Sequence, residues 1–432
     1  VFARHSSVGF AVVSRHDGVD LRTHGRRRQC GTFCQRGLVK MIIHHWRVSN
    51  LLSDLFASRW WALVPGRLPA LLLAAMLLLV ACGNKEPPVA PLLRLADVLG
   101  SSDTGGFVRA DMPRAFAFPA DHGPHPGFRN EWWYFTGNVQ TAEGRHFGYQ
   151  LTFFTAAQPP GLQLPASAWA SDTLWMAHLA LTDVEGAQHY AFERFSRANP
   201  GLAGAQAQPF HVWLDDWQVA EEGNGSWHIS AAEQGITLDL QLQSLKPPVL
   251  QGDQGLSRKS DTPGNASYYY SMTRLATRGV IAVDGERYQI NGYSWLDREW
   301  STSALDADQS GWDWFSLQFD DNTELMLYQL RTRSDGIDPH SEGHWTAADG
   351  SQSRTTPGEL ALEPVAWWTG PDGVRYATQW RLLRNGQGLR VEALLDDQFL
   401  PLALPYWEGA VRVINEDTGA VAGHGFLEMV RQ

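Results

Sequence analysis

From about residue 114 to its end, the chain alternates short runs of aromatic and β-branched residues with polar turn sequences. Four pairs of runs flank turns of the Glu-Gly, Asp-Gly or Asp-Asn kind: 132–139 with 145–155, 176–182 with 188–195, 280–283 with 287–293, and 315–319 with 324–330. Turns of this kind between extended runs are typical of β-hairpins. Because no stretch shows a long helical period of apolar residues, the pattern predicts an all-β protein built from antiparallel sheets.

One pattern of runs occurs twice. The run 132–136 (WWYFT) leads through a turn to 149–151 (YQL), and the run 312–316 (WDWFS) leads to 328–330 (YQL). Two closing segments also match, because 292–297 (GYSWLD) and 423–428 (GHGFLE) carry an aromatic-Leu-acid triplet at the same distance from a glycine. We therefore expect two tandem domains, 114–303 and 304–432, that meet near residues 301–310.

Each expected domain must hide the edges of a long antiparallel sheet. Closing the sheet into a β-barrel does so, and a barrel of about eight strands can hold one small ligand. The prediction is two tandem antiparallel β-barrels, each curled around an apolar interior.

The first 113 residues follow a different pattern. Residues 1–40 are rich in arginine and show no periodicity, which indicates an over-extended start and a true start near Met41. Residues 41–81 are predicted to be a signal peptide, because the apolar run 68–81 (LPALLLAAMLLLVA) follows basic residues. The run is shorter than the ~20 residues that a membrane span needs.

The end of this run carries a possible lipidation signal. Leu79-Val80-Ala81-Cys82 resembles a bacterial lipobox, which implies cleavage before Cys82 and acyl chains on its thiol. No Asp follows at the second position, so we expect the periplasmic face of the outer membrane; the alternative is an uncleaved N-terminal anchor. Residues 82–113, rich in proline and glycine, are expected to form a tether.

Composition excludes several kinds of site. Residues 82–432 hold 24 basic and 43 acidic residues, and such an acidic body repels nucleic acid. Of the cysteines Cys30, Cys34 and Cys82, only Cys82 lies at or beyond the signal. A disulfide framework and cysteine-based zinc sites are therefore excluded from the mature protein. The 19 tryptophans are far above common usage and need a structural or functional reason.

Three long motifs carry a family resemblance. They are 118–126 (FPADHGPHP) with 130–138 (NEWWYFTGN), 295–300 (WLDREW) with 311–314 (GWDW), and 406–411 (YWEGAV). Together they resemble the AttH family, which belongs with the carotenoid 1,2-hydratases (hydroxyneurosporene synthases). The resemblance covers about residues 114–432 and implies two lipocalin-like barrels and no cofactor. Family members are often labelled hydrolases, but the chain lacks a Gly-x-Ser-x-Gly elbow, a P-loop and a dinucleotide fingerprint.

The resemblance implies a chemistry in which water adds to an isolated carbon–carbon double bond. An acid protonates the alkene, aromatic faces stabilise the cation, and water attacks it. The acid must stay neutral near pH 7, which requires an apolar site that raises its pKa. Asp297 is the candidate, because it lies where the hydratase motif has Tyr-x-Asp; here Trp295 takes the aromatic position.

Strand geometry adds a second acid to this candidate site. In an extended strand, Trp295, Asp297 and Glu299 share one face, and Leu296 and Arg298 the other. Two carboxylates on one face can raise each other's pKa, so Glu299 is the second catalytic candidate. The alternative is structural: an Asp-Arg-Glu belt of ion pairs that joins the two barrels.

Further aromatic and histidine residues are candidates for binding a ligand: Trp133, His178, Tyr268, Tyr270, Trp295, Trp312 and Trp314. For His178 and the tyrosines, packing in a barrel core is an equally open alternative.

The loop before residue 130 holds the other candidates. His122 and His125, with Asp121, could bind a metal, but a lid or plug is favoured and no metal site is predicted. Glu131 is expected to form a structural pair with Arg129 or Arg298.

Three functions follow from these observations. The first is an envelope lipoprotein that binds or carries an apolar molecule such as a lipid or an isoprenoid. The second is a cofactor-free hydratase or isomerase in which Asp297 is the general acid. The third is an accessory of an ABC-type exporter. A cavity that holds Asp297 and aromatic rings would favour the enzyme, a cavity without an acid the carrier, and barrels filled by their own side chains the accessory.

Overall fold

The computed structural model describes residues 104–161, 163–223, 225–303 and 305–431, which belong to one compact unit. The expected signal peptide, Cys82 and the first part of the expected tether lie outside these residues. Within the described part, a short 3-10 turn, η1 (Ala120–His122), precedes a succession of β-strands. No described helix is long and apolar enough to cross a membrane.

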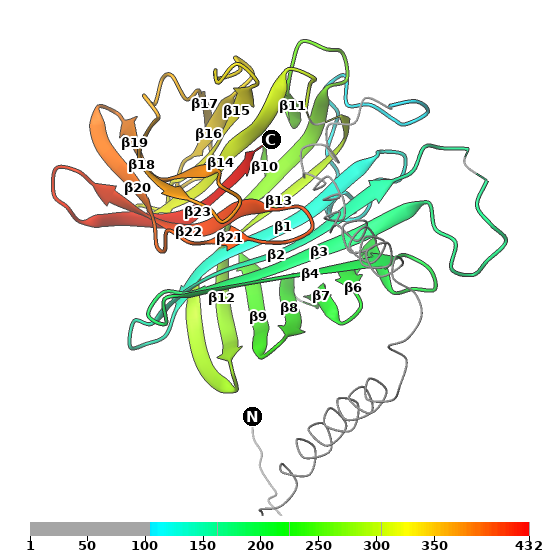
Figure 1. Cartoon of the computed structure of the whole chain (residues 1–432), viewed down its shortest axis with the longest axis horizontal. Coiled ribbons are helices and arrows are strands. Elements are labelled where there is room, and N and C mark those ends of the chain that lie inside the picture. Colours follow the sequence, from blue (N-terminus) through cyan, green and yellow to red (C-terminus); the bar gives the residue numbers. More distant parts are fainter. Residues whose placement is uncertain (1–103, 162, 224, 304, 432) are drawn as a thin grey trace, which may run out of the picture. The chain divides into compact units, whose positions relative to one another are not determined.

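The first sheet holds thirteen antiparallel strands in the order β4-β3-β2-β1-β13-β12-β9-β8-β7-β6-β5, with β10 and β11 paired to β12 beside this path (Figure 1). Its strands are β1 (Asn130–Gln140), β2 (His146–Ala157), β3 (Thr173–Asp183), β4 (Gln188–Arg197), β5 (Ala203–Ala207), β6 (Phe210–Leu214), β7 (Trp217–Glu222), β8 (Ser226–Glu233), β9 (Ile236–Ser244), β10 (Val249–Leu250), β11 (Leu256–Arg258), β12 (Ala266–Val283) and β13 (Glu286–Ser303).

The second sheet holds ten antiparallel strands in the order β17-β16-β15-β14-β23-β22-β20-β19-β18, with β21 paired to β22. Its strands are β14 (Gln309–Phe319), β15 (Glu324–Thr332), β16 (Glu342–Thr346), β17 (Gln352–Thr355), β18 (Glu363–Thr369), β19 (Arg375–Arg384), β20 (Gln387–Ala393), β21 (Phe399–Leu400), β22 (Tyr406–Asn415) and β23 (Val421–Arg431).

The two sheets repeat one topology. In each, four successive strands form a meander, and the first strand of the meander pairs with the last strand of the sheet: β1 with β13, and β14 with β23. This confirms the predicted duplication, the all-β class and the four hairpins β1–β2, β3–β4, β12–β13 and β14–β15.

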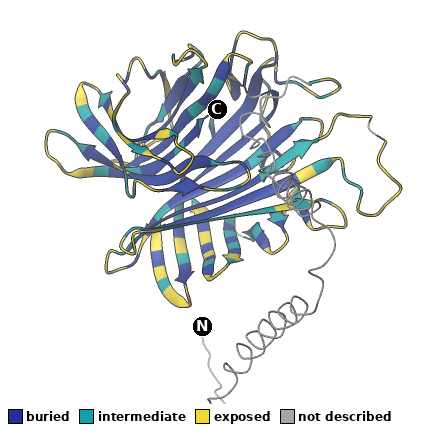
Figure 2. Cartoon of the chain, viewed as in Figure 1, coloured by how far each residue is buried: buried dark blue, intermediate teal, exposed yellow. Residues whose placement is uncertain are grey.

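Each sheet curls like a barrel around its own core. The first core includes Trp133 and Trp300, and the second includes Trp380 and Trp407. Figure 2 shows the central strands of both sheets as almost wholly buried, whereas β8 and β9 alternate between buried and more exposed residues. Both barrel interiors are therefore packed with the protein's own side chains.

A third apolar cluster lies between the outer faces of the two sheets. It combines Tyr134, Tyr269 and Trp295 of the first sheet with Trp314 and Phe426 of the second. Strand β13 explains how this arises, because every residue from 294 to 303 is buried. Since successive side chains of a strand point to opposite faces, one half of this stretch fills the first barrel and the other half faces the second sheet.

The chain before β1 packs on the first barrel. The Val108 amide donates to the Gly127 carbonyl at 2.8 Å, and the Tyr268 hydroxyl donates to the Met112 carbonyl at 2.9 Å. The end of the expected tether is thus docked on the barrel. In the following loop, the His122 ring lies 2.6 Å from the Tyr270 hydroxyl, so the loop closes the first core as a plug.

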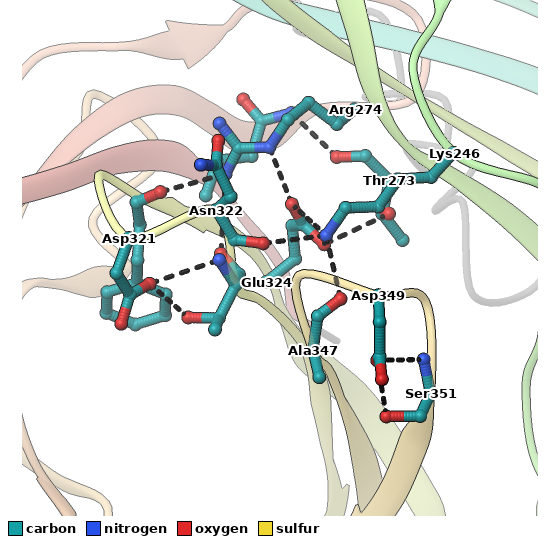
Figure 3. A network of polar contacts seen from close by, with 12 residues as sticks. Lys246, Thr273, Arg274, Asp321, Asn322, Glu324, Ala347, Asp349 and Ser351 are labelled. Carbon is teal, nitrogen blue, oxygen red and sulfur yellow. Dashed lines mark hydrogen bonds and ion pairs between the residues drawn. The ribbon is translucent and has the colours of Figure 1, made fainter.

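A buried cluster of charges fastens the sheets together (Figure 3). Glu324, which begins β15, accepts hydrogen bonds from Arg274 Nε at 2.6 Å and from Lys246 Nζ at 2.7 Å. Arg274 lies on β12 and Lys246 in the loop after β9, so both cations come from the part of the chain that builds the first sheet. Lys246 also donates to the carbonyls of Asn322 and Ala347. The Glu324 side chain is fully buried, and the two cations compensate its charge.

We expect Glu324→Ala to lower the free energy of unfolding by about 3–5 kcal/mol, because it leaves two buried cations without a counter-charge. Urea unfolding followed by tryptophan fluorescence measures the change. Glu363→Ala, at an exposed position of β18, is the control and should cost less than about 0.5 kcal/mol. Equal effects of the two substitutions would show that the cluster does not hold the sheets together.

Candidate functional site

A cavity of about 80 Å³ lies between the outer faces of the two sheets. The first sheet contributes β1, β2, β12 and β13 to its wall, and the second contributes β14, β15 and β23. Aromatic and aliphatic side chains form most of the wall, with a few ionisable groups among them. The lining residues are Trp132, Tyr134, Phe154, Lys259, Tyr269, Asp297, Glu299, Leu305, Trp312, Trp314, Tyr328, Leu330 and Glu428. Such a wall suits an apolar molecule held by a few polar contacts.

Asp297 is the buried acid of the first sheet. Its Oδ1 accepts hydrogen bonds from Ser271 Oγ at 2.5 Å and from Trp295 Nε1 at 2.8 Å, and its Oδ2 accepts one from the Tyr269 hydroxyl at 2.8 Å. Burial raises the pKa of Asp297 to about 7, with a smaller contribution from the charge of Glu299. The three hydrogen bonds oppose this shift, since each of them stabilises the carboxylate.

Tyr269 connects this acid to the second sheet. Its oxygen accepts a hydrogen bond from Trp314 Nε1 at 3.1 Å while its hydroxyl donates to Asp297. Burial and the neighbouring carboxylates raise the pKa of Tyr269 well above its usual value. The tyrosine therefore stays a neutral donor and fixes the orientation of the acid.

Glu299 is held by a buried cation. Lys259 Nζ lies 3.3 Å from Glu299 Oε1 and donates to Ser257 Oγ at 3.0 Å. The same ammonium group lies 4.1 Å from the centre of the Tyr328 ring. Ser267 also donates to Glu299. Of the acids in the cavity wall, Glu299 is thus the one with a counter-charge at hand.

Glu428 of β23 is the acid of the second sheet. Trp312 Nε1 donates to its Oε1, and its side chain is hydrogen-bonded to Glu408 of β22. Burial raises the pKa of Glu428 to about 7. Burial and the charge of Glu428 raise the pKa of Glu408 well above its usual value, although the Tyr134 hydroxyl donates to Glu408. Glu408 is therefore the member of the pair that keeps a proton.

The duplication relates the two acids. Asp297 lies opposite Tyr134 in the β1–β13 pair, and Glu428 lies opposite Trp314 in the corresponding β14–β23 pair. The two acids therefore occupy equivalent register positions, one in each wall of the cavity.

The structure places the predicted residues in two groups. Trp295, Asp297 and Glu299 share the face toward the second sheet, as the alternation predicts, and Trp312 and Trp314 line the cavity. Trp133, Tyr268 and Tyr270 instead point into the first barrel, which corrects their assignment to a ligand site. In β12 it is Tyr269, the residue between the two tyrosines, that faces the cavity, because alternate residues face opposite sides.

His178 lies in the interface beside Phe154 but does not line the cavity. Its Nδ1 lies 2.8 Å from the Tyr406 hydroxyl. Burial lowers the pKa of His178 to about 3, so its ring is neutral. A packed, hydrogen-bonded histidine describes it better than a pocket acid.

The expected belt of Asp297, Arg298 and Glu299 does not form. Arg298 points into the first barrel, where its Nη2 lies 2.6 Å from Glu131 Oε1 and its guanidinium group lies 3.9 Å from the centre of the Trp133 ring. This is one of the two structural pairs predicted for Glu131. The cluster around Glu324 joins the sheets instead.

The loop histidine that could have bound a metal is engaged by carboxylates. His125 Nδ1 lies 2.6 Å from Glu131 Oε1, and Nε2 lies 3.0 Å from Asp121 Oδ1. Its ring stacks on Trp300. Within the described ranges, no three His, Cys, Asp or Glu residues are grouped as metal ligands.

Several residues of the site were absent from the sequence prediction: Tyr134, Lys259, Tyr269, Tyr328 and Glu428 in the cavity wall, and Glu408, which pairs with Glu428. For Glu428 a signal existed, because the matching triplets of the two closing segments align it with Asp297. For Lys259 there was none, since it lies in a loop after β11 whose position depends on the packing of the two sheets.

Comparison with known proteins identifies the family. The model of the AttH-like family matches residues 109–431. The chain belongs to the AttH-like family. This confirms the resemblance carried by the sequence motifs. No curated protein matches the chain.

Two crystal structures resemble this AttH-like protein. One is from Nitrosomonas europaea and is described as an AttH. It is 32% identical with a TM-score of 0.67, and the match covers 75% of this chain and 99% of the Nitrosomonas chain. The other is kievitone hydratase from Nectria haematococca, which is 15% identical with a TM-score of 0.56 and covers 76% of this chain and 97% of its own. The second likeness concerns the fold alone.

We expect Asp297→Asn to remove a stability penalty that depends on pH. The raised pKa means that the folded state binds more protons than the unfolded state between about pH 4 and about pH 7. Below about pH 4, Asp297 is protonated in both the folded and the unfolded state and does not destabilise the fold. As the pH rises to about 7, the unfolded state loses this proton first, so the free energy of unfolding of the wild type falls. Relative to the wild type, the variant should gain on the order of 4 kcal/mol between these limits.

Urea unfolding at a series of pH values measures this difference. Asp111→Asn, at an exposed position, is the matched control and should show no such gain. A difference between Asp297→Asn and the wild type that does not change with pH would contradict the raised pKa.

Proposed function

We propose that this AttH-like protein is a cofactor-free hydratase or isomerase that acts on a carbon–carbon double bond of an apolar, isoprenoid-like molecule, with Asp297 as general acid. The observation that carries the proposal is the position of Asp297: a buried carboxyl group with a raised pKa in a cavity walled by aromatic rings. A protonated acid is costly to keep near pH 7 and useful where a proton must be delivered.

The first step would be protonation of the alkene. The π electrons form a new carbon–hydrogen bond with the proton of Asp297, and the other carbon becomes a cation. The rings of Trp132, Trp312 and Trp314 lie in the same cavity wall and offer electron-rich faces that stabilise this cation. The lining is largely apolar, which strengthens these interactions.

The second step decides between the two reactions. If water attacks the cation, the product is an alcohol. If a neighbouring carbon instead returns a proton to the Asp297 carboxylate, the double bond moves and the product is an isomer. The likeness to a protein named kievitone hydratase supports the first outcome, because it shows the same fold in a protein named as a hydratase.

A carrier function is the second candidate, and one observation favours it. The cavity wall is largely apolar and aromatic, which suits retention of a lipid or isoprenoid whether or not it reacts. Since both barrels are filled by their own cores, a carried molecule would also use the space between the sheets. Native mass spectrometry of the protein purified from its own envelope, with a search for copurified lipid, tests this function.

The lipid anchor at Cys82, attachment to the periplasmic face of the outer membrane and partnership with an ABC-type exporter stay predictions. Labelling with a radioactive fatty acid in the wild type and in Cys82→Ser tests the anchor.

We expect Asp297→Asn to lower the rate of alkene hydration by about a hundredfold or more, because an amide cannot deliver a proton. A panel of prenylated phenols and linear isoprenoid alkenes in heavy-oxygen water provides the assay, with label uptake read by mass spectrometry. Quenching of tryptophan fluorescence by the same compounds should persist in the variant. Unchanged turnover in Asp297→Asn would refute the role of this acid.

A further inference from the structure

The wall formed by the second sheet carries an acid that the proposed role of Asp297 leaves unexplained. Glu428 lies in the lining of the same cavity, at the register position equivalent to that of Asp297. Addition of water to an alkene needs two proton transfers, one to carbon and one from water. Asp297 supplies the first, and the second needs an acceptor, which is either the carboxylate that Asp297 has become or a second base in the wall.

The pair formed by Glu428 and Glu408 is built to hold a single proton. The two residues lie directly opposite each other on β23 and β22; Glu408 is fully buried, and Glu428 is partly buried in the cavity wall. Two carboxyl groups this close in an apolar site cannot both ionise, so the pair keeps one proton and one negative charge.

The surrounding hydrogen bonds indicate which of the two carboxyl groups carries that proton. Glu428 accepts from Trp312 Nε1, and Glu408 Oε1 accepts from the Tyr134 hydroxyl. Glu408 Oε2 meets no hydrogen-bond donor in the described part of the chain, as expected for an oxygen that itself carries a proton. The hydroxyl of Glu408 then donates to Glu428, and Glu428 holds the negative charge.

We propose that Glu428 is the second catalytic residue of this site, the general base that takes a proton from the attacking water, and that Glu408 positions it by holding the proton of the pair. This inference rests on the proposed hydration of an alkene. It assigns opposite tasks to two acids that the duplication has placed in opposite walls.

The proton balance closes with these groups. Asp297 gives its proton to carbon and becomes a carboxylate. The oxygen of water bonds to the cationic carbon, and Glu428 takes one of its protons and becomes neutral. The sum is alkene plus water to alcohol, and a proton passes back from Glu428 to Asp297 before the next turnover.

The other acid in the wall is less suited to this task. Glu299 has Lys259 at 3.3 Å and accepts from Ser267, so its negative charge is already compensated. Glu428 is hydrogen-bonded to an indole and a carboxyl group, and in the part of the chain that the structure describes no cation forms an ion pair with it. A base with an uncompensated charge gains more from taking a proton.

The ionisable groups that act on the pair come from several strands. They are Tyr134 on β1, Glu299 on β13 and Tyr406 on β22. The raised pKa values of both tyrosines keep them neutral near pH 7. The low-pH limb of the rate therefore reports a carboxyl group of the cavity wall, and the Glu428→Gln variant tells Glu428 from Glu299.

Two isosteric variants test the assignment on an alkene that the wild type hydrates. Glu428→Gln removes the base, and we expect kcat to fall by about a hundredfold with KM changed less than about threefold. Glu408→Gln imitates the protonated form and keeps an N–H donor toward Glu428, so its kcat should fall by less than about tenfold. Glu408→Leu has no such donor, so its kcat should fall clearly further than that of Glu408→Gln. Restoring the donor with glutamine should therefore restore part of the lost kcat. Equal losses in the two Gln variants would overturn the assignment.

The pH profile separates the base from the acid. The wild-type rate should fall at low pH as Glu428 gains a proton and at high pH as Asp297 loses one. Glu428→Gln should lack the low-pH fall, and Glu408→Gln should keep it. A low-pH fall that persists in Glu428→Gln would refute the role of Glu428.

An infrared measurement tests the shared proton without any substrate. At about pH 9, the wild type should retain the carbonyl band of a protonated carboxyl group, and Glu408→Gln should lose it. Circular dichroism confirms that the variants are folded. Absence of the band in the wild type overturns the shared proton. A wild type that shows the band but hydrates no alkene refutes the proposed function, and with it the base role, while the proton-sharing pair stands.

Discussion

Burial of both faces of the central strands is the constraint on which the rest of this structure depends. The stretch 294–303 of β13 is buried throughout, and its alternate side chains fill the first barrel and the interface. A barrel in isolation would expose the second set to water. Docking of the second sheet removes that apolar surface from water, which stabilises the arrangement by roughly 25 cal/mol per Å². The close approach is also steric: a Cβ atom on Gly148 of β2 would lie 2.3 Å from that of Ala410.

The same burial creates the chemistry. A carboxyl group on the outer face of an isolated barrel would be hydrated and ionised at neutral pH. Docking of the sheets buries Asp297 and partly buries Glu428, and desolvation is the largest cause of both raised pKa values. The acids weaken the interface above the pH at which they ionise, and the apolar contacts around them offset this cost. The interface is thus less stable than a fully apolar one at the positions where a proton donor and a proton acceptor are required.

The sequence predicted most of the fold because its signals are local. Turn dipeptides mark the hairpins, and alternation places Trp295, Asp297 and Glu299 on one face. The sequence did not predict which residues of each neighbouring strand face the acid. Tyr268 and Tyr270 looked equivalent to Tyr269 in composition, and only the pairing of Tyr269 with Glu299 and of Ser271 with Asp297 shows which set faces the acid.

The location of the cavity could not follow from the sequence either. A barrel of this kind can hold a ligand inside, and the pattern of runs does not say whether large side chains fill it. Here the residues at inward positions are large, such as Trp133 and Trp380, so the interiors are solid. The cavity that brings an acid into an apolar space lies between the barrels instead.

The duplication explains why two acids meet there. Equivalent strands of the two sheets, β13 and β23, carry their acids at equivalent positions, and each acid receives an indole N–H: Asp297 from Trp295 and Glu428 from Trp312. The environments then differ. Asp297 is surrounded by three neutral donors, whereas Glu428 shares a proton with Glu408. A repeated strand plan thus supplies two similar groups with different partners. Ser271 lies opposite Asp297 and Glu408 opposite Glu428, and the indole donors come from non-equivalent strands, β13 and β14.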